Sequence, residues 1–104
     1  MRAYDGFAVT EILVARTPGD PDAERFLTRY HVEIREGETA TEHDVTLSRG
    51  DFDRLAGDRT PESFIRDCFA FLLGREPKES ILRSFDVSVI GRYFPEFERT
   101  IAST

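Results

Sequence analysis

The sequence has one cysteine, one lysine, no tryptophan and no apolar run of the roughly 18 residues that a membrane span needs. Its lone cysteine, Cys68, cannot form a disulfide within the chain. The first residues lead into Asp5 instead of the apolar stretch of a signal peptide. These absences predict a cytoplasmic protein with no membrane contact. Its 104 residues suit a single domain, residues 1–104, that folds without disulfides or metal.

Positive charge is also scarce. The formal net charge is −6 and the isoelectric point is about 4.9, which disfavours nucleic acids and anionic membranes as partners, because their phosphates repel an acidic chain. Most of the excess negative charge lies in residues 1–60, which hold eight arginines against thirteen acidic residues. We interpret this half as a solvated, acidic sheet surface, with docking of a basic partner as the alternative.

Signatures of catalysis and of cofactor binding are missing as well. Residues 57–60 lack the glycine spacing and the lysine of a phosphate-binding loop, and no serine stands in the glycine-flanked turn of a hydrolase nucleophile. One cysteine and two histidines are too few for a readable zinc site. The acidic loop at residues 20–24 lacks the central glycine and terminal glutamate of an EF-hand. The sequence therefore predicts no catalytic residue, no cofactor, no metal and a buried, inert thiol at Cys68.

Three segments have the residue patterns of β-strands. Residues 7–16, FAVTEILVAR, are rich in β-branched residues and lie between Gly6 and a proline-containing loop. Residues 25–35 and 39–47 alternate between apolar and polar side chains, as half-buried antiparallel strands do. The first strand differs because it is apolar on both faces. One of its faces therefore needs cover from the rest of the chain or from a partner.

The alternation also predicts the register of a hairpin. A two-residue turn at Gly37 and Glu38 keeps both apolar sets on one face. The resulting opposite pairs are Tyr30–Val45, Val32–His43 and His31–Asp44. His31 is then expected in a surface ion pair, and His43 is expected under the helices or at the sheet edge with a hydrogen-bond partner. Neither is predicted to be catalytic, because a general base needs a positioned partner in a cleft.

The second half of the chain has the punctuation of short helices, expected near residues 48–56, 61–73, 78–84 and 87–93. Ser48, Thr60 and Asp86 are the expected N-caps, and Gly74 is expected in the left-handed conformation that ends a helix. Strands followed by helices indicate an α+β fold. We predict a three-stranded antiparallel meander (residues 5–47, with 25–35 as the central strand), one face of which is covered by the helical part (residues 48–97).

The predicted core combines one face of the strands with the helical stripes. It comprises Ile12, Val14, Tyr30, Val32, Ile34, Val45, Leu47, Phe52, Leu55, Ile65, Cys68, Phe69, Leu72, Ile81, Leu82, Phe85, Ile90 and Phe94.

The segment ESILRSFDVSVIGRYFPEFE, residues 79–98, resembles a pattern found in a family of short uncharacterised bacterial proteins. The resemblance covers about residues 45–98. It implies a single-domain bacterial protein and brings no activity, cofactor or catalytic residue with it.

Without a chemical signature, the sequence favours a non-enzymatic protein-interaction module, with a homodimer as its simplest form. The two-faced first strand is the motive, because Val9 and Leu13 need a cover. Phe97 and Ile101, near the C-terminus, are the other expected interface residues.

Two alternatives stay open. The first is a small-molecule binder or enzyme with a pocket between the sheet and the helices, whose polar groups would be Tyr30, His43, Arg66 and Arg92. The second is a DNA-binding regulator, because residues 44–73 resemble the strand–helix–turn–helix order of ribbon-helix-helix repressors. In that family the strand reads the major groove with basic or amide side chains, whereas this chain has Glu42, Asp44 and Thr46 there. The strand is instead expected to pair within its own chain.

Overall fold

The computed structural model describes residues 10–19 and 26–103. In chain order the elements are β1 (Thr10–Arg16), β2 (Leu27–Glu36), β3 (Thr39–Ser48), α1 (Arg49–Leu55), α2 (Pro61–Leu73), the 3₁₀ turn η2 (Lys78–Ser80), β4 (Ser84–Asp86), the 3₁₀ turn η3 (Val87–Val89), α3 (Ile90–Tyr93) and α4 (Phe97–Ala102). Three strands therefore come first and helices follow, as the α+β prediction requires. One short strand, β4, lies among the helices.

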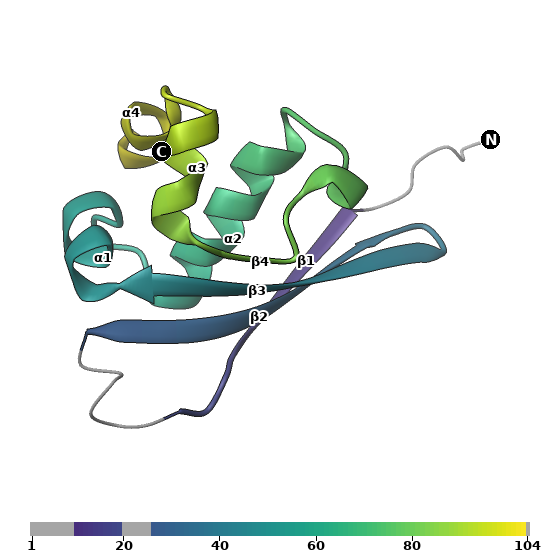
Figure 1. Cartoon of the computed structure of the whole chain (residues 1–104), viewed down its shortest axis with the longest axis horizontal. Coiled ribbons are helices and arrows are strands. Elements are labelled where there is room, and N and C mark those ends of the chain that lie inside the picture. Colours follow the sequence, from purple (N-terminus) through teal and green to yellow (C-terminus); the bar gives the residue numbers. More distant parts are fainter. Residues whose placement is uncertain (1–9, 20–25, 104) are drawn as a thin grey trace.

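The strands form a mixed sheet in the order β1-β2-β3-β4. The first three are the predicted antiparallel meander with β2 between its neighbours, whereas β4 pairs parallel with β3. The helices of the described residues cover one face of this sheet (Figure 1). The predicted sheet is therefore correct for three strands and lacks the fourth.

The hairpin of β2 and β3 has the predicted register. Tyr30 pairs with Val45, Val32 with His43 and His31 with Asp44. Gly37 adopts a positive φ of 59°. Among the described residues no residue other than glycine has a positive φ, so Glu38, the second turn residue, does not. A positive φ at only the first turn position matches a type II′ turn, which suits the twist of a hairpin.

The N-caps are also where the sequence puts them. Ser48 Oγ accepts a hydrogen bond from the Asp51 N–H, and Thr60 Oγ1 accepts one from the Ser63 N–H. The expectation for Gly74 is wrong, because its φ is −73° and its backbone is right-handed. Its N–H bonds to carbonyls of the last turn of α2 instead, so the helix ends without a left-handed residue.

The helix expected at residues 78–84 is a second error. Only Lys78–Ser80 forms a helical turn, and Ser84–Asp86 is extended as β4. The segment is extended because β3 supplies its partners: the Asp44 N–H donates to Arg83 O at 2.7 Å. The next helix is split into η3 and α3, with Asp86 capping η3 as predicted. A local apolar stripe carries no information about such distant partners.

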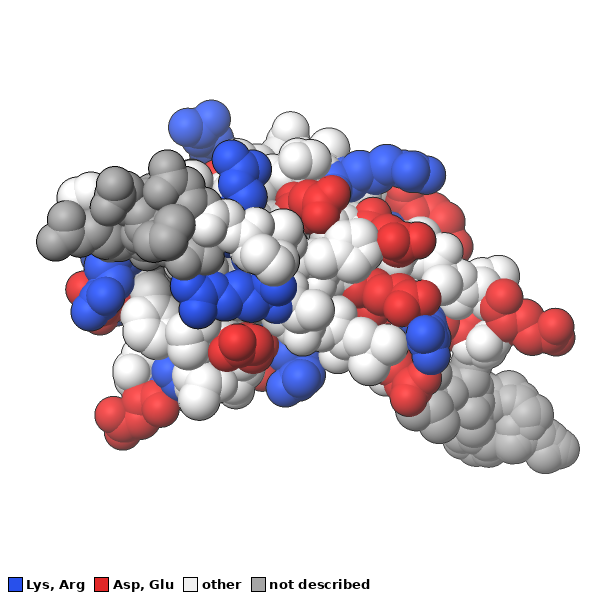
Figure 2. Space-filling model, turned by 90° about the horizontal axis from the view of Figure 1, so that it is seen from below, with Lys and Arg blue, Asp and Glu red and all other residues white. Residues whose placement is uncertain are grey.

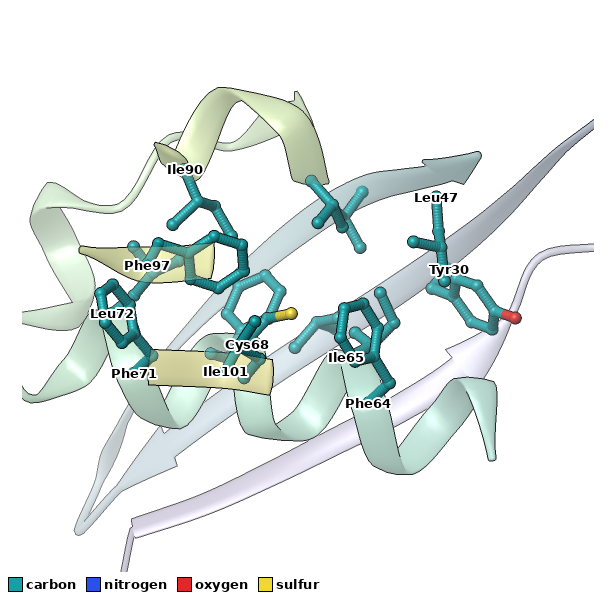
Figure 3. Close-up of a cluster of buried hydrophobic side chains, with 14 of the residues drawn as sticks. Tyr30, Leu47, Phe64, Ile65, Cys68, Phe71, Leu72, Ile90, Phe97 and Ile101 are labelled. Atoms are coloured by element: carbon teal, nitrogen blue, oxygen red, sulfur yellow. The ribbon is translucent and has the colours of Figure 1, made fainter. Parts of the chain in front are cut away.

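The buried side chains form one cluster between the sheet and the helices (Figure 3). Most of the predicted core lies in it, and Ile12, Val14, Phe52, Phe85 and Phe94 pack against it while half-buried. Leu82 is the one clear error, because 47% of it is exposed. The prediction also omitted members of the cluster, namely Ala56, Phe64, Phe71, Val87, Phe97 and Ile101.

Arg59 ties the helices together. Its guanidinium donates to the carbonyls of Leu55 at 3.0 Å and Ile101 at 2.6 Å, and pairs with Asp67 at 3.0 Å. It also lies over the ring of Phe64, with 5.4 Å to the centroid. Because these groups belong to α1, α2 and α4, one cation satisfies the orphan carbonyls of two helix ends and fixes how three helices meet.

Candidate functional site

The four residues proposed to bind a small molecule do not converge. His43 and Tyr30 are buried in the sheet, whereas Arg66 and Arg92 are exposed on α2 and α3. A pocket of about 230 Å³ beside Tyr30 includes none of the other three residues. The structure thus gives no support to a site made from this set.

His43 is a core histidine, as expected. Its ring lies against Phe69, with 5.5 Å between centroids, and is almost fully buried. Nδ1 donates to Leu82 O at 2.7 Å, because a carbonyl can only accept. Nε2 is then the acceptor for the hydroxyl of Thr41 at 2.9 Å. Nδ1 therefore fixes the segment before β4 to β3, Nε2 is held by a residue of β3 itself, and neither nitrogen is available to a substrate.

His31 lies on the other face of the sheet in a surface ion pair, also as expected. Nδ1 is 3.0 Å from Asp44 Oδ1, and Nε2 is 2.8 Å from Glu42 Oε1. The hydrogen bond that the ring donates to the Asp44 carboxylate is the main cause that raises the pKa of His31, burial opposes it, and Glu42 adds to it. All three side chains are well exposed. The arrangement stabilises charge at a wet surface.

This outer face of the sheet is acidic at one end. Figure 2 shows the acidic side chains mainly over the half toward the β2–β3 turn and the basic ones mainly over the other half. By register, Glu33 and Glu42 lie opposite each other in the half of the hairpin toward this turn, and Arg35 pairs with Glu33 at 3.1 Å.

Cys68 is inert in this setting. The thiol is fully buried in the core, and burial is the main cause that raises its pKa above the ordinary range. A thiol that stays protonated is a poor nucleophile and a poor metal ligand. Within residues 10–19 and 26–103, no three His, Cys, Asp or Glu side chains group closely enough to hold a metal ion.

The four predicted interface residues differ in where the structure places them. Phe97 and Ile101 are buried at the 1% and 2% levels by their own chain, so placing them on a contact surface is a mistake. Their spacing places both on the inward face of α4, a helix that was not predicted from the sequence. Val9 lies outside the described residues. Leu13 remains, with 41% of its surface exposed.

Leu13 lies at the centre of β1, the edge strand of the sheet. The Thr17 N–H donates to Arg29 O at 2.9 Å, so the odd-numbered residues of β1 direct their backbone groups toward β2. By alternation, Ile12 and Val14 direct theirs outward. Arg66 on α2 marks that direction, because its Nε donates to Ile12 O at 3.4 Å from outside the sheet. Among the described residues no strand pairs along this edge.

The other side of the sheet is occupied at the middle of β3. β3 pairs with β2 along its whole length and with β4 at Asp44–Thr46. The expectation that this strand pairs within its own chain is therefore confirmed. A ribbon-helix-helix dimer needs the equivalent strand to pair with its two-fold mate, and at residues 44–46 that position is taken.

The outward-facing backbone groups of Ile12 and Val14 were not predicted from the sequence as a candidate site. A strand that is apolar on both faces was the available signal. Which of its two edges would be open depends on strand order, which no local pattern encodes.

Within the described ranges, no helix has the length and apolarity to cross a membrane. Family models, curated proteins and solved structures were all compared with the chain, and none of them matches it.

Proposed function

We propose that this protein is an interaction module that acts as a symmetric dimer, joined by antiparallel pairing of β1 with β1 of a second copy. One observation carries the proposal: Ile12 and Val14 direct N–H and C=O groups away from the sheet on a strand that is apolar on both faces. Such an edge is a template for another strand. Addition of a strand would supply backbone hydrogen bonds and cover apolar surface together.

The sequence of β1 suits pairing with itself. The strand runs from Thr10 to Arg16, so its midpoint is Leu13. A two-fold axis at Leu13 pairs every residue of the strand with a residue of the second copy. Ile12 then lies opposite Val14 of the second copy, and the two exchange both backbone hydrogen bonds.

Side chains agree with this register. On the outer face, Leu13 would lie opposite its own copy in a close, non-hydrogen-bonded pair, and Glu11 would lie opposite Ala15. No like charges face each other. A two-fold axis at Val14 would instead place Ile12 opposite Arg16, and an axis at Ile12 would place Glu11 opposite Leu13. The axis at Leu13 is therefore the best of the three.

The consequence for function is a sheet of twice the width. Its outer face would carry two acidic ends, one from each copy, at the β2–β3 turns (Figure 2). Such a surface suits a basic protein partner and would repel nucleic acid.

The test uses one substitution at two positions of the same strand face. Leu13→Lys places two ammonium groups opposite each other across the axis, and we expect association to weaken by at least about tenfold. Ala15→Lys adds the same charge opposite Glu11 and is expected to leave association unchanged or stronger. Both side chains are exposed, so both variants should fold. Sedimentation equilibrium at micromolar concentration measures the dimer directly.

A mixing experiment separates this dimer from other modes. Leu13→Lys and Leu13→Glu variants should each be monomers, and an equimolar mixture should form the heterodimer, because opposite charges then meet at the axis. A wild-type protein that stays monomeric at about 100 μM would reject the proposal. Equal weakening by Leu13→Lys and Ala15→Lys, without rescue on mixing, would reject the register.

A further inference from the structure

A second exposed leucine, Leu82, forms one wall of an apolar groove on the helical side of the molecule. The groove has a volume of about 190 Å³. It lies between the end of α2, the η2–β4 segment and α3. Its lining residues are Leu72, Glu76, Ser80, Ile81, Leu82, Phe85, Val89, Ile90, Tyr93 and Phe94.

Local geometry explains why the chain leaves this groove unfilled. His43 holds the carbonyl of Leu82 from below, and the backbone there is extended, so Ile81 points into the core while Leu82 points out. On the opposite wall α3 ends at Tyr93, because Pro95 cannot continue the helix. Tyr93 is 66% exposed at the rim. The hydrogen bond from His43 thus positions the Leu82 wall, and the end of α3 positions Tyr93 on the other wall.

Two polar residues, Glu76 and Ser80, lie among the apolar residues that line the groove. Glu76 is a half-buried residue of the lining, and no cation among the described residues pairs with its carboxylate. The nearby Arg75 is already engaged, because it pairs with Glu96 at 3.0 Å and lies over the ring of Phe71. Ser80 adds a hydroxyl at the rim. The groove therefore combines eight apolar side chains with one unneutralised negative charge.

We propose that this groove binds a small organic cation, an aromatic ring joined by a short chain to an ammonium group. The ring matches the apolar walls and the volume, since cavities of roughly 150 Å³ accept a benzene ring. The ammonium group matches Glu76, because a carboxylate beside apolar surface favours a cation over a neutral or anionic group. The site is separate from the β1 edge, so it does not depend on the proposed dimer.

The probe for the test is 2-phenylethylamine, which is a cation at neutral pH. The matched control ligand is 3-phenylpropanoate, with the same ring and a similar chain but a carboxylate. We expect amide chemical shifts in ¹⁵N-labelled protein to move for Ile81, Leu82 and Phe94, with a Kd on the order of 1 mM for so small a ligand. Binding of the propanoate should be at least about fivefold weaker.

Two variants test the assignment of the groups. Glu76→Gln should bring the two ligands to within about twofold of each other, because the charge that separates them is gone. Leu82→Lys removes an apolar wall and repels the amine, so binding should fall below detection. Leu13→Lys is the matched control, since it makes the same change at a similarly exposed leucine on β1 and should leave amine binding unchanged.

Thermal unfolding of each variant confirms that loss of binding is not loss of fold. Equal binding of amine and propanoate to the wild-type protein, or shifts that cluster away from the groove, would overturn the proposal. So would amine binding that survives Leu82→Lys. An unsaturated titration at about 20 mM amine, more than tenfold above the expected Kd, would reject it outright.

Discussion

The two sides of the three-stranded meander differ in whether another strand covers them: β4 pairs with β3 on one side, and no described strand pairs with β1 on the other. At the β3 edge, a three-residue strand is held by hydrogen bonds from His43 to Leu82 O and from Thr46 to Asp86, in addition to its backbone pairing. At the β1 edge, the described contact is one long hydrogen bond from the exposed Arg66. A short strand closes an edge only when side chains hold it there, because three residues of ladder are marginal alone. The edge without such side chains is the one open to association.

The largest expected effect comes from breaking the closed edge. His43→Ala removes a fully buried ring and leaves Leu82 O and Thr41 without their partner, so we expect the free energy of unfolding to fall by about 3 kcal/mol. His31→Ala is the matched control on the neighbouring strand and should change it by no more than about 0.5 kcal/mol, since that side chain is exposed. Urea unfolding measures both. Equal effects would show that His43 does not hold the edge.

The second effect concerns Asp86 and depends on pH. Burial opposes ionisation of this carboxyl, but hydrogen bonds from Thr46 and Ser88 outweigh it and lower its pKa. A lowered folded pKa gives stability that is complete above the ordinary value near 3.9 and is lost as pH falls through the folded value. Asp86→Asn should therefore cost about 1 kcal/mol at neutral pH.

That difference between wild type and Asp86→Asn should shrink as the pH is lowered from about 5 to about 2. Urea unfolding at a series of pH values gives this comparison, and Asp58→Asn, at an exposed position, is the control. A difference that does not depend on pH would mean that the charge of Asp86 has no part in holding β4.

The third effect concerns association through the β1 edge. In the proposed dimer, Arg66 competes with the second strand for Ile12 O. Arg66→Ala should therefore strengthen association about threefold, in the sense that a charged side chain protects an edge. Arg92→Ala removes an exposed arginine of α3 and should leave association unchanged. Sedimentation equilibrium distinguishes the outcomes, and weaker association of Arg66→Ala would assign Arg66 to the interface itself.

The smallest effect lies on the outer face. Because Asp44 raises the pKa of His31, the ion pair contributes stability that is complete below the ordinary value near 6.5 and is lost as pH rises through the folded value. All partners are exposed, so the loss between about pH 6 and pH 8 should be below about 0.5 kcal/mol. His31→Gln should remove this dependence. A larger change in wild type would point to a buried titrating group.

The comparison of the edges also shows what the sequence can reveal. The β2–β3 register was predictable because alternation at Tyr30, Val32 and Val45 allows one apolar face, and a slip by one residue would expose it. β4 was not predictable, since Ser84–Asp86 is a strand by virtue of its pairing with the distant β3. The same error placed Leu82 in the core, because a helix over residues 78–84 would turn it inward. Local periodicity identifies the apolar face of a segment, whereas its tertiary partner determines whether a short segment is a helix or a strand.

The candidate sites also differ in whether local sequence patterns could identify them. Leu13 could be identified from the sequence because its strand is apolar on both faces. The groove could not, because it depends on where β3 holds the Leu82 backbone and on how α3 lies against α2. Phe97 and Ile101 were misplaced for a related reason. Their inward spacing is clear on a helix, but α4 begins two residues after Pro95 and was not expected.

The parallel pairing of β4 also has a consequence for the order of folding. The β2–β3 hairpin is closed by a two-residue turn and can form in about 1–10 μs. The Thr46–Asp86 contact spans 40 residues and must wait for the intervening helices. During that interval the β3 edge is uncovered too, and a nascent chain can pair through either side of its sheet. Refolding yield should therefore fall as protein concentration rises, because the edge that protects the finished molecule is closed late.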